Sequence, residues 1–318
     1  MMRLLDEMVE HGMNLISIMM QSYSIYDPIH DGYSWPVRNG KLQAYRDENA
    51  MNSDPNTEFL SNIIKEASKR NIEVELFLNY GIWNHQRIKE DYPNSSIQVG
   101  RKGEKEGWVH CPDSPGAWQQ GLDEVEDLLS FYDDANIKRF AFERLGYKSS
   151  RHCHCGFTEQ KFVDSGATNF DLWKQNRISL LLGKYVDFIR SVRPDIKIGL
   201  HSQGKSSWGH DPKRFRAVGI DYVLPHTIQF KTSKRRLYKM LDHLHPNDCI
   251  LHFDARNTAP RDYPIWIKTP RIIRRVLRRI NKYKENRGDH IKGFLFFNEP
   301  MVSRDNKSAI YEFADKYA

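Results

Sequence analysis

Residues 137–147 read IKRFAFERLGY, and this stretch decides the fold. It follows a segment whose apolar residues have helical spacing, continues as a short apolar run of buried-strand character, and reaches a carboxylate at Glu143. In a (β/α) barrel, the carboxyl ends of the parallel strands carry the active site. Glu143 is therefore the first candidate for chemistry.

Four later stretches repeat this pattern. Each is a short apolar run that ends in a polar side chain: IKIGLHSQ (196–203) with His201, IDYVLPH (220–226) with His226, CILHFDAR (249–256) with Asp254, and IKGFLFFNEP (291–300) with Glu299. Helical stretches separate them, without a Ser/Gly-rich linker or a change of composition. We predict an α/β fold, a (β/α)8 TIM barrel, in which residues 1–318 form a single catalytic domain.

The start of the chain lacks the strand that normally opens such a barrel. Residues 3–11 have the pattern of a helix and residues 14–20 (NLISIMM) that of a strand, so Glu143 would end the fourth strand and Asp254 the seventh. The first strand then lies upstream, is borrowed or has been lost. Seven strands would leave open edges, which an upstream segment or a partner chain in a homo-oligomer could close.

Length and composition fit a single barrel. The chain has 318 residues, of which 39% are hydrophobic and 28% charged, as in a soluble globular protein. It contains no apolar run long enough to span a membrane, and its start, MMRLLDEMVEHG, lacks the apolar core of a signal peptide. We therefore expect a cytoplasmic protein that has no membrane partner.

The net charge of +7 raises the question of nucleic-acid binding. The strongest basic run, residues 269–287 (TPRIIRRVLRRINKYKENR), has its apolar residues at helical spacing, which leaves the arginines on the opposite face. No nucleic-acid-binding motif accompanies this run. We interpret it as a solvated outer helix of the barrel and expect no nucleic-acid partner.

The carboxylates at the strand ends suit glycoside cleavage. That reaction needs two carboxyl groups on opposite sides of the scissile bond, one as acid and the other as nucleophile or as base for water. Glu143 and Asp254 would face each other across the mouth of the barrel, and Glu299 is a third candidate. A single carboxylate at a strand end can also be a simple ion-pair partner, but three carboxylates at the same end favour catalysis.

Aromatic and polar residues near the strand ends favour a carbohydrate substrate. A long aromatic loop (21–56) and a second loop (92–109), which we expect to be mobile, would border the cleft. Flat rings can stack on the C–H faces of a sugar, although large aromatics also pack loops onto a barrel. The predicted substrate-binding residues are Tyr33, Trp35, Asn79, Trp83, Arg144, His201, Gln203, His226, Arg256 and Asn298.

Three segments resemble a known group of proteins. GMNLISIMMQSYSIYDPIHDGYSWP followed by TEFLSNIIKEASKRNIEVELFLNYGIWN, together with RHCHCGFTEQKF, resembles the hypothetical glycosyl hydrolase families related to the α-L-fucosidases over roughly residues 1–165. The resemblance implies a retaining (β/α)-barrel glycosidase with a nucleophile on the fourth strand. Fucosidases usually carry Asp there, where this chain has Glu143. In the larger clan of barrel glycosidases the fourth-strand Glu is the acid/base, which would make Asp254 the nucleophile, and both assignments stay open.

RHCHCGFTEQKF (151–162) also resembles a C-x-C-x-x-C-x-x-x-F segment of those proteins, with Thr158 in place of the third cysteine. Consecutive Cys and His residues cannot all reach one tetrahedral ion, so a further ligand such as Cys111 would be needed. The ligand spacing is incomplete, so we predict neither a metal nor another cofactor, and whether Cys153 and Cys155 bind a structural metal stays open. Cys249 opens a predicted strand, where we expect a buried thiol.

Two other functions fit part of the same pattern. A metal-dependent amidohydrolase places His on the fifth and sixth strands and Asp on a late strand, as His201, His226 and Asp254 do, but it also needs an H-x-H pair on the first strand. A sugar-binding barrel without activity would show the same residues. We predict a glycoside hydrolase of carbohydrate metabolism, with these two functions as alternatives.

Overall fold

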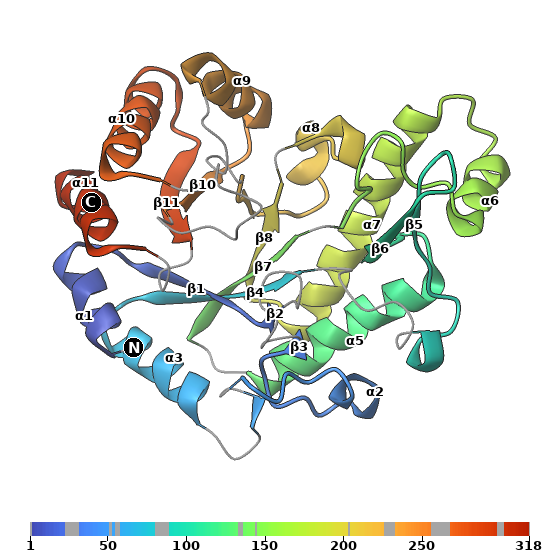
Figure 1. Cartoon of the computed structure of the whole chain (residues 1–318), viewed down its shortest axis with the longest axis horizontal. Helices are drawn as coiled ribbons and strands as arrows, with labels where there is room; N and C mark the ends of the chain where they lie inside the picture. The colour runs from blue at the N-terminus through green and yellow to red at the C-terminus, as the bar shows by residue number, and fades with distance from the viewer. Residues whose placement is uncertain are drawn as a thin grey trace.

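A seven-stranded parallel sheet forms the centre of the protein (Figure 1). The computed structural model describes residues 2–22, 32–50, 53–54, 58–79, 89–132, 136–143, 145–202, 204–225, 233–255, 268–297 and 302–317. The strands, in their order across the sheet, are β1 (Leu15–Met19), β4 (Glu73–Asn79), β7 (Ile137–Glu143), β8 (Lys197–His201), β9 (Tyr222–Val223), β10 (Cys249–Asp254) and β11 (Ile291–Phe297). Order in space follows order in the chain, as in a (β/α) barrel.

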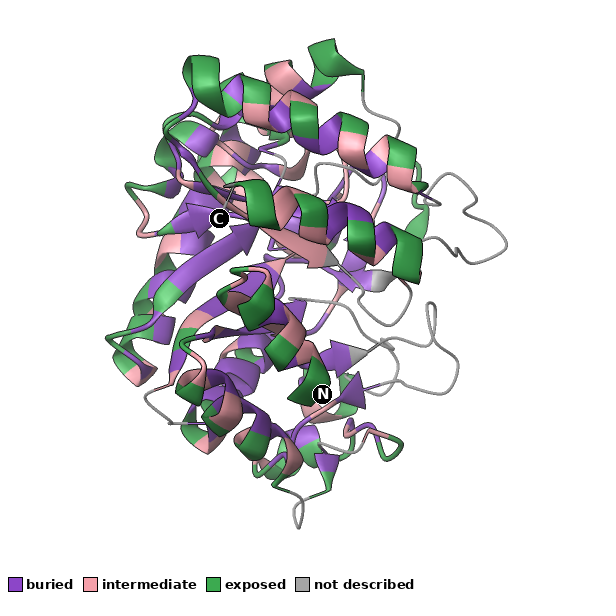
Figure 2. Ribbon diagram, turned by 90° about the vertical axis from the view of Figure 1, so that its left-hand side faces the viewer, coloured by how far each residue is buried: buried purple, intermediate pink, exposed green. Residues whose placement is uncertain are grey.

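Helices connect consecutive strands and cover the outside of the sheet. They are α1 (Met2–Glu10), α3 (Phe59–Lys69), α5 (Pro115–Phe131), α7 (Phe170–Val192), α8 (Pro212–Phe215), α9 (Lys234–Leu244), α10 (Pro270–Arg287) and α11 (Arg304–Tyr317). Figure 2 shows buried strands between helices whose outward faces are exposed. The predicted α/β fold with an incomplete TIM barrel is confirmed, because the parallel strands curl into a half-barrel and no β1–β11 ladder exists among the described residues.

Helix α10 shows why the basic run folds as it does. Thr269 caps it, with its side chain accepting a hydrogen bond from the backbone N–H of Ile272, and Pro270 occupies the first helical position. Its apolar side chains are buried against the sheet, which leaves the arginines outside.

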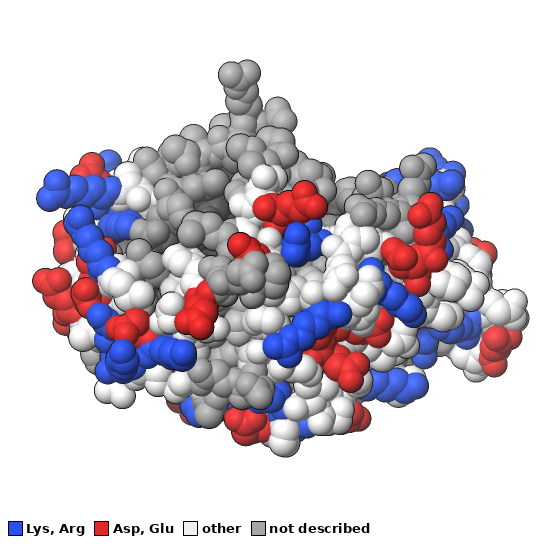
Figure 3. Space-filling view, turned by 90° about the horizontal axis from the view of Figure 1, so that it is seen from below, with Lys and Arg blue, Asp and Glu red and all other residues white. Residues whose placement is uncertain are grey.

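On the face of the molecule seen in Figure 3, Lys and Arg side chains alternate with Asp and Glu side chains rather than forming a patch of one sign.

The inside of the sheet holds its own layer of side chains. Phe77, Ala141, Tyr222, Leu224 and Ile250 form a buried apolar cluster that is separate from the main core beneath the helices. Each of these strands alternates, so one set of residues points inward and the other packs against the helices.

A buried carboxyl group lies in that inner layer. Glu75 accepts hydrogen bonds from the hydroxyls of Ser17, at 2.6 Å, and of Tyr222. Burial raises the pKa of Glu75, and these hydrogen bonds oppose the rise. The group thus joins β1, β4 and β9 across the interior of the half-barrel.

Residues 92–109, which the sequence analysis treats as a mobile loop, contain an antiparallel hairpin of β5 (Ile97–Val99) and β6 (Lys105–His110). The prediction of a loop was wrong here because β5 has only 3 residues and β6 (KEGWVH) does not alternate between apolar and polar residues. The hairpin is tied to the segment after β7, since the backbone N–H of His154 donates to the carbonyl of Val99 at 2.7 Å.

The loop predicted at residues 21–56 also carries short elements. These are β2 (Gln21–Ser22), β3 (Gly32–Tyr33), which pair antiparallel, and α2 (Gly40–Gln43). Two further elements follow β7 and β8, namely α6 (Gly156–Asp164) and η2 (Ser206–Trp208).

The first and last helices meet beside the two sheet edges (Figure 1). The ring of His11, just after α1, stacks on Tyr311 of α11 at a centroid distance of 4.0 Å. Tyr311 also donates a hydrogen bond to Glu7 at 2.8 Å, and His11 Nδ1 lies 2.7 Å from Asp315 Oδ1. These contacts connect the start and the end of the described chain.

Within the described part of the chain, no helix combines the length and the apolar character that crossing a membrane would require.

Candidate functional site

Three of the predicted site residues lie at one level across neighbouring strands. In the sheet register, Asn79 at the end of β4 pairs with Glu143 at the end of β7, and Glu143 pairs with His201 at the end of β8. Parallel strands in register bring their carboxyl ends to the same rim. The rim therefore brings together a carboxamide, a carboxylate and an imidazole from three different strands.

Glu143 and His201 lie close enough to influence each other. His201 Nδ1 is 3.9 Å from Glu143 Oε2, which is longer than a direct hydrogen bond but within ion-pair range when the imidazole is protonated. The side chain of Glu143 is 12% exposed and that of His201 is 1% exposed. Glu143 thus reaches solvent at the mouth of the half-barrel while His201 lies beneath the surface.

Aromatic rings form the floor under this pair. Phe77 of β4 stacks against His201 with ring centroids 4.3 Å apart, and His252 of β10 meets His201 edge-on at 5.2 Å. The rings fix the His201 imidazole between two strands. His201 also approaches Glu143 at the rim.

His252, Gln21 and Phe77 belong to the site but were not among the predicted residues. His252 stands two positions before Asp254, a spacing that places both on one face of a strand and that could have identified it. Gln21 is buried beside β4, and its Oε1 accepts a hydrogen bond from the backbone N–H of Asn79 at 3.3 Å. Nothing in the local sequence marks Gln21, because it meets Asn79 only across the sheet.

The remaining predicted residues can be placed only in part. Asp254 is the last residue of β10 and pairs in register with Phe297, but its side chain lies outside the described residues. Seven further predicted residues lie entirely outside the described part of the chain. They are Trp83, Arg144, Gln203, His226, Arg256, Asn298 and Glu299.

Tyr33 and Trp35 differ from the prediction. Both side chains are fully buried, with Tyr33 donating a hydrogen bond to Glu124 at 2.5 Å and Trp35 Nε1 donating to Asp127 at 2.7 Å. They anchor the first loop to α5 and do not offer a ring to a ligand. Their buried polar partners on α5 explain why these aromatics turn inward.

The loop after β7 is held by buried polar contacts. Tyr147 donates a hydrogen bond to Asp113 at 2.8 Å, and His210 Nε2 lies 2.9 Å from the carbonyl oxygen of Leu145. Arg177 of α7 pairs with the other oxygen of Asp113 at 2.7 Å. The loop after β7 is therefore anchored at Tyr147 to Asp113, which follows β6 of the hairpin.

A buried cluster of three cysteines lies beside this loop. One sulfur from each of Cys111, Cys153 and Cys155 falls within 4.8 Å of the others, and the Cys155 and Cys111 sulfurs are 3.4 Å apart. Side-chain hydrogen bonds shared with Cys111 and Cys153 lower the pKa of Cys155, which occupies the N-cap position of α6 without a side-chain capping hydrogen bond. The sequence analysis names Cys111 as a possible further ligand, and the structure places its sulfur in the cluster.

These three thiols fit part of a zinc-type ligand set. A tetrahedral structural site takes four ligands, and beside the three sulfurs the hydroxyl of Thr158 lies 3.1 Å from the Cys111 sulfur and 3.6 Å from the Cys155 sulfur. The Thr158 hydroxyl also donates to Asp113 at 3.0 Å. The cluster therefore offers three soft ligands and a hydroxyl that is already hydrogen-bonded.

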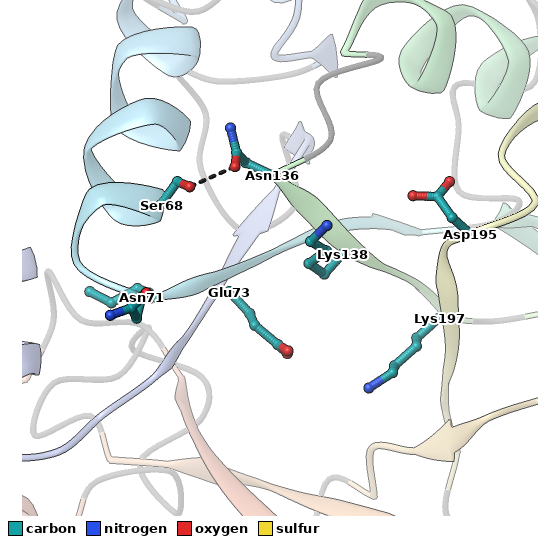
Figure 4. A pocket seen from close by; sticks show the side chains of 8 residues that line it. Ser68, Asn71, Glu73, Asn136, Lys138, Asp195 and Lys197 are labelled. Atoms are coloured by element: carbon teal, nitrogen blue, oxygen red, sulfur yellow. Dashed lines mark hydrogen bonds between the residues drawn. The ribbon is translucent and has the colours of Figure 1, made fainter.

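A cavity of about 330 Å³ opens at the opposite end of the sheet (Figure 4). It is lined by Ser68, Asn71, Ile72, Glu73, Asn136, Lys138, Asp195 and Lys197, which lie at the amino ends of β4, β7 and β8. In barrel enzymes this face serves stability rather than catalysis. The hydrogen bond from Ser68 to Asn136, 2.6 Å, which joins α3 to the start of β7, agrees with that role.

No family model matches the chain, and no curated protein matches it in sequence. Its fold is similar to that of several solved enzymes. One is an α-L-fucosidase isoenzyme 2 from Paenibacillus thiaminolyticus, with a TM-score of 0.66, 13% identity, and coverage of 99% of this chain and 45% of that one.

Two further structures show the same fold. The first is a β-galactosidase from the haloarchaeon Halorubrum lacusprofundi, with a TM-score of 0.65, 11% identity, and coverage of 99% and 55% of the two chains. The second is a GH20 exo-β-N-acetylglucosaminidase from Vibrio harveyi, with a TM-score of 0.59, 9% identity, and coverage of 99% and 50%.

The chain spans about half the length of these structures. At identities of 9–13% the comparison shows a shared fold only. The activity of this chain must therefore be argued from its own residues. The sequence and the structure therefore agree on a barrel of the type found in glycoside hydrolases of several families.

Proposed function

We propose that this protein is a glycoside hydrolase in which Glu143 and Asp254 form the main catalytic pair. The observation that carries the proposal is the register of Asn79, Glu143 and His201 at the carboxyl ends of three adjacent strands. The similarity in fold to a fucosidase, a β-galactosidase and an N-acetylglucosaminidase supports the same class of reaction.

The proposed chemistry divides the work between two carboxyl groups. One protonates the departing glycosidic oxygen, and the other attacks the anomeric carbon or activates water on the opposite face of the sugar. Glu143 is solvent-accessible at the rim and lies beside His201, which suits a group that exchanges protons with a substrate. Glu299, which follows the next strand in the sequence after that of Asp254, is proposed as a third member of the site or as a substitute for one of the pair.

The proposed substrate is a carbohydrate bound at the mouth of the half-barrel. Asn79 and His201 would hydrogen-bond sugar hydroxyls next to Glu143, with Trp83, Arg144, Gln203, His226, Arg256 and Asn298 as further binding residues. Tyr33 and Trp35 are not included, because the polar atoms of their side chains donate hydrogen bonds to Glu124 and Asp127 of α5 and their rings pack there, away from the strand ends.

The test is Glu143→Gln, assayed on a panel of 4-nitrophenyl α- and β-glycosides. An amide keeps the shape of the side chain and removes its acid–base and nucleophilic capacity, so kcat should fall by about 10²–10⁴-fold while the protein stays folded. Asp254→Asn should give a loss of similar size.

Glu126→Gln is the matched control, because Glu126 is an exposed glutamate on α5. It should leave kcat unchanged. Full activity of Glu143→Gln would remove this residue from the mechanism, and a wild-type protein that binds sugars without turning over any glycoside would make the barrel a binding protein.

A further inference from the structure

A second group of ligating side chains lies at the amino end of the half-barrel, away from Glu143. His245 follows α9 in the connection to β10, and Asp289 and His290 precede β11. Each of the three offers one nitrogen or oxygen atom, and these atoms all lie within 4.8 Å of one another. Connections to two neighbouring strands thus bring two imidazoles and a carboxylate together.

His290 is the buried member of the group. It is 3% exposed, and neither of its ring nitrogens makes a hydrogen bond of normal geometry. A buried polar group in this state needs an explanation, and a bound ion is one of the few available. The rings of His245 and Tyr283 pack edge-on against His290, with centroids 5.0 Å and 5.9 Å away.

The charge around His290 suits a cation. The Asp289 carboxylate belongs to the group itself, and a second carboxylate, Asp242, accepts a hydrogen bond at 2.8 Å from the hydroxyl of Tyr283, whose ring packs against His290.

We propose that His245, Asp289 and His290 bind a divalent transition-metal ion of the zinc class and thereby join the connection before β10 to the connection before β11. Two imidazoles and one carboxylate are a ligand set that zinc accepts, with water in the fourth position. His245 and Asp289 are exposed, so their side chains can close the short distance that separates the ligand atoms from ideal geometry.

The backbone around the group is already fixed. The carbonyl of His290 accepts a hydrogen bond from the backbone N–H of Cys249 at 2.7 Å, which ties it to the start of β10. On the other side, Asn247 donates to the carbonyls of Leu244 and Pro212, at 2.7 and 2.9 Å. A metal ion would therefore bridge two anchored segments rather than order a loose one.

The experiment is a titration of the chelator-treated protein with zinc, followed by calorimetry and by the thermal midpoint of unfolding. The wild-type protein should bind zinc and unfold at a higher temperature with it. His245→Gln and Asp289→Asn, both at exposed positions, should each weaken binding at this site at least tenfold and abolish the thermal shift.

Two control variants separate this site from other sources of zinc binding. Cys155→Ser disrupts the cysteine cluster, and Asp248→Asn removes a neighbouring acid that pairs with Lys292 at 3.8 Å. Both should keep the binding event that His245→Gln loses. The proposal is overturned if the wild-type protein binds no zinc, if Cys155→Ser loses all binding, or if His245→Gln and Asp289→Asn bind as the wild type does.

Discussion

His210 joins the loop after β8 to the loop after β7 through both of its ring nitrogens. The carbonyl oxygen of Leu145 can only accept, so Nε2 carries the proton and Nδ1 accepts from the Ser202 hydroxyl at 2.6 Å. Burial lowers the pKa of His210 to about 4 from its ordinary value of 6.5. The neutral ring is therefore part of the folded structure next to the rim.

This shift gives stability a defined pH dependence. As pH falls through 6.5 the unfolded chain takes up a proton that the folded protein takes up only near pH 4, so stability declines across that window by about 3 kcal/mol at most. In His210→Gln, urea unfolding between pH 7 and pH 4 should show a shallower decline. Parallel curves for the wild type and the variant would contradict this assignment.

At the same scale, the sequence predicts some site residues and misses others for physical reasons. Glu143 and His201 end apolar runs, and this local signal was sufficient to place them at the rim. Tyr33 and Trp35 carry no such signal, because their partners Glu124 and Asp127 lie about ninety residues later on α5. Whether a loop aromatic faces solvent or the core depends on such distant partners.

At the scale of elements, α5 organises the first loop with buried acids. Asp127 accepts hydrogen bonds from Trp35 Nε1 and from the backbone N–H groups of Arg38 and Asn39, at 2.7, 3.0 and 2.6 Å. Charge-assisted bonds of this kind are stronger than neutral ones. One carboxylate on a helix thus holds three donors of a segment that has little regular structure.

Asp127→Ala should destabilise the protein by about 2–4 kcal/mol, because it leaves buried donors without acceptors. The measurement is chemical denaturation, with hydrogen exchange over residues 33–47 to show that the loop is released. Glu126→Ala, at the adjacent exposed position, should change stability by less than about 0.5 kcal/mol. Equal effects of the two variants would show that Asp127 does not anchor the loop.

Most of the long strands and helices could be predicted from the sequence, and the short ones could not. The apolar run predicted as a strand that reaches Glu143 coincides with β7, and α10 begins at Pro270, directly after the Thr269 cap. In the hairpin of β5 and β6 the strands are too short for a periodic pattern, and pairing between them supplies the missing information. Periodicity predicts elements that are long and amphipathic, whereas short strands depend on their partners.

At the scale of the whole molecule, the contact between α1 and α11 bridges the open side of the sheet. Tyr311→Ala removes both the stack on His11 and the hydrogen bond to Glu7, and should lower the free energy of unfolding by about 1–3 kcal/mol. Hydrogen exchange in β1 and β11 should accelerate, since those strands form the edges that the contact flanks.

Tyr311→Phe is the matched variant. It keeps the stack and loses only the hydroxyl, so its cost should be about 1 kcal/mol. If the alanine variant exchanged β1 and β11 at the wild-type rate, the two helices would not be supporting the sheet edges.

The four cysteines are all buried, three beside the hairpin of β5 and β6 and the fourth at the start of β10. A thiol reagent in solution should therefore react with the native protein no faster than each region opens. Alkylation followed by peptide mass spectrometry would then time two openings in one sample. If Cys153 is modified sooner than Cys249, the side cluster separates before the sheet does, and if both are modified together, the half-barrel comes apart as one unit.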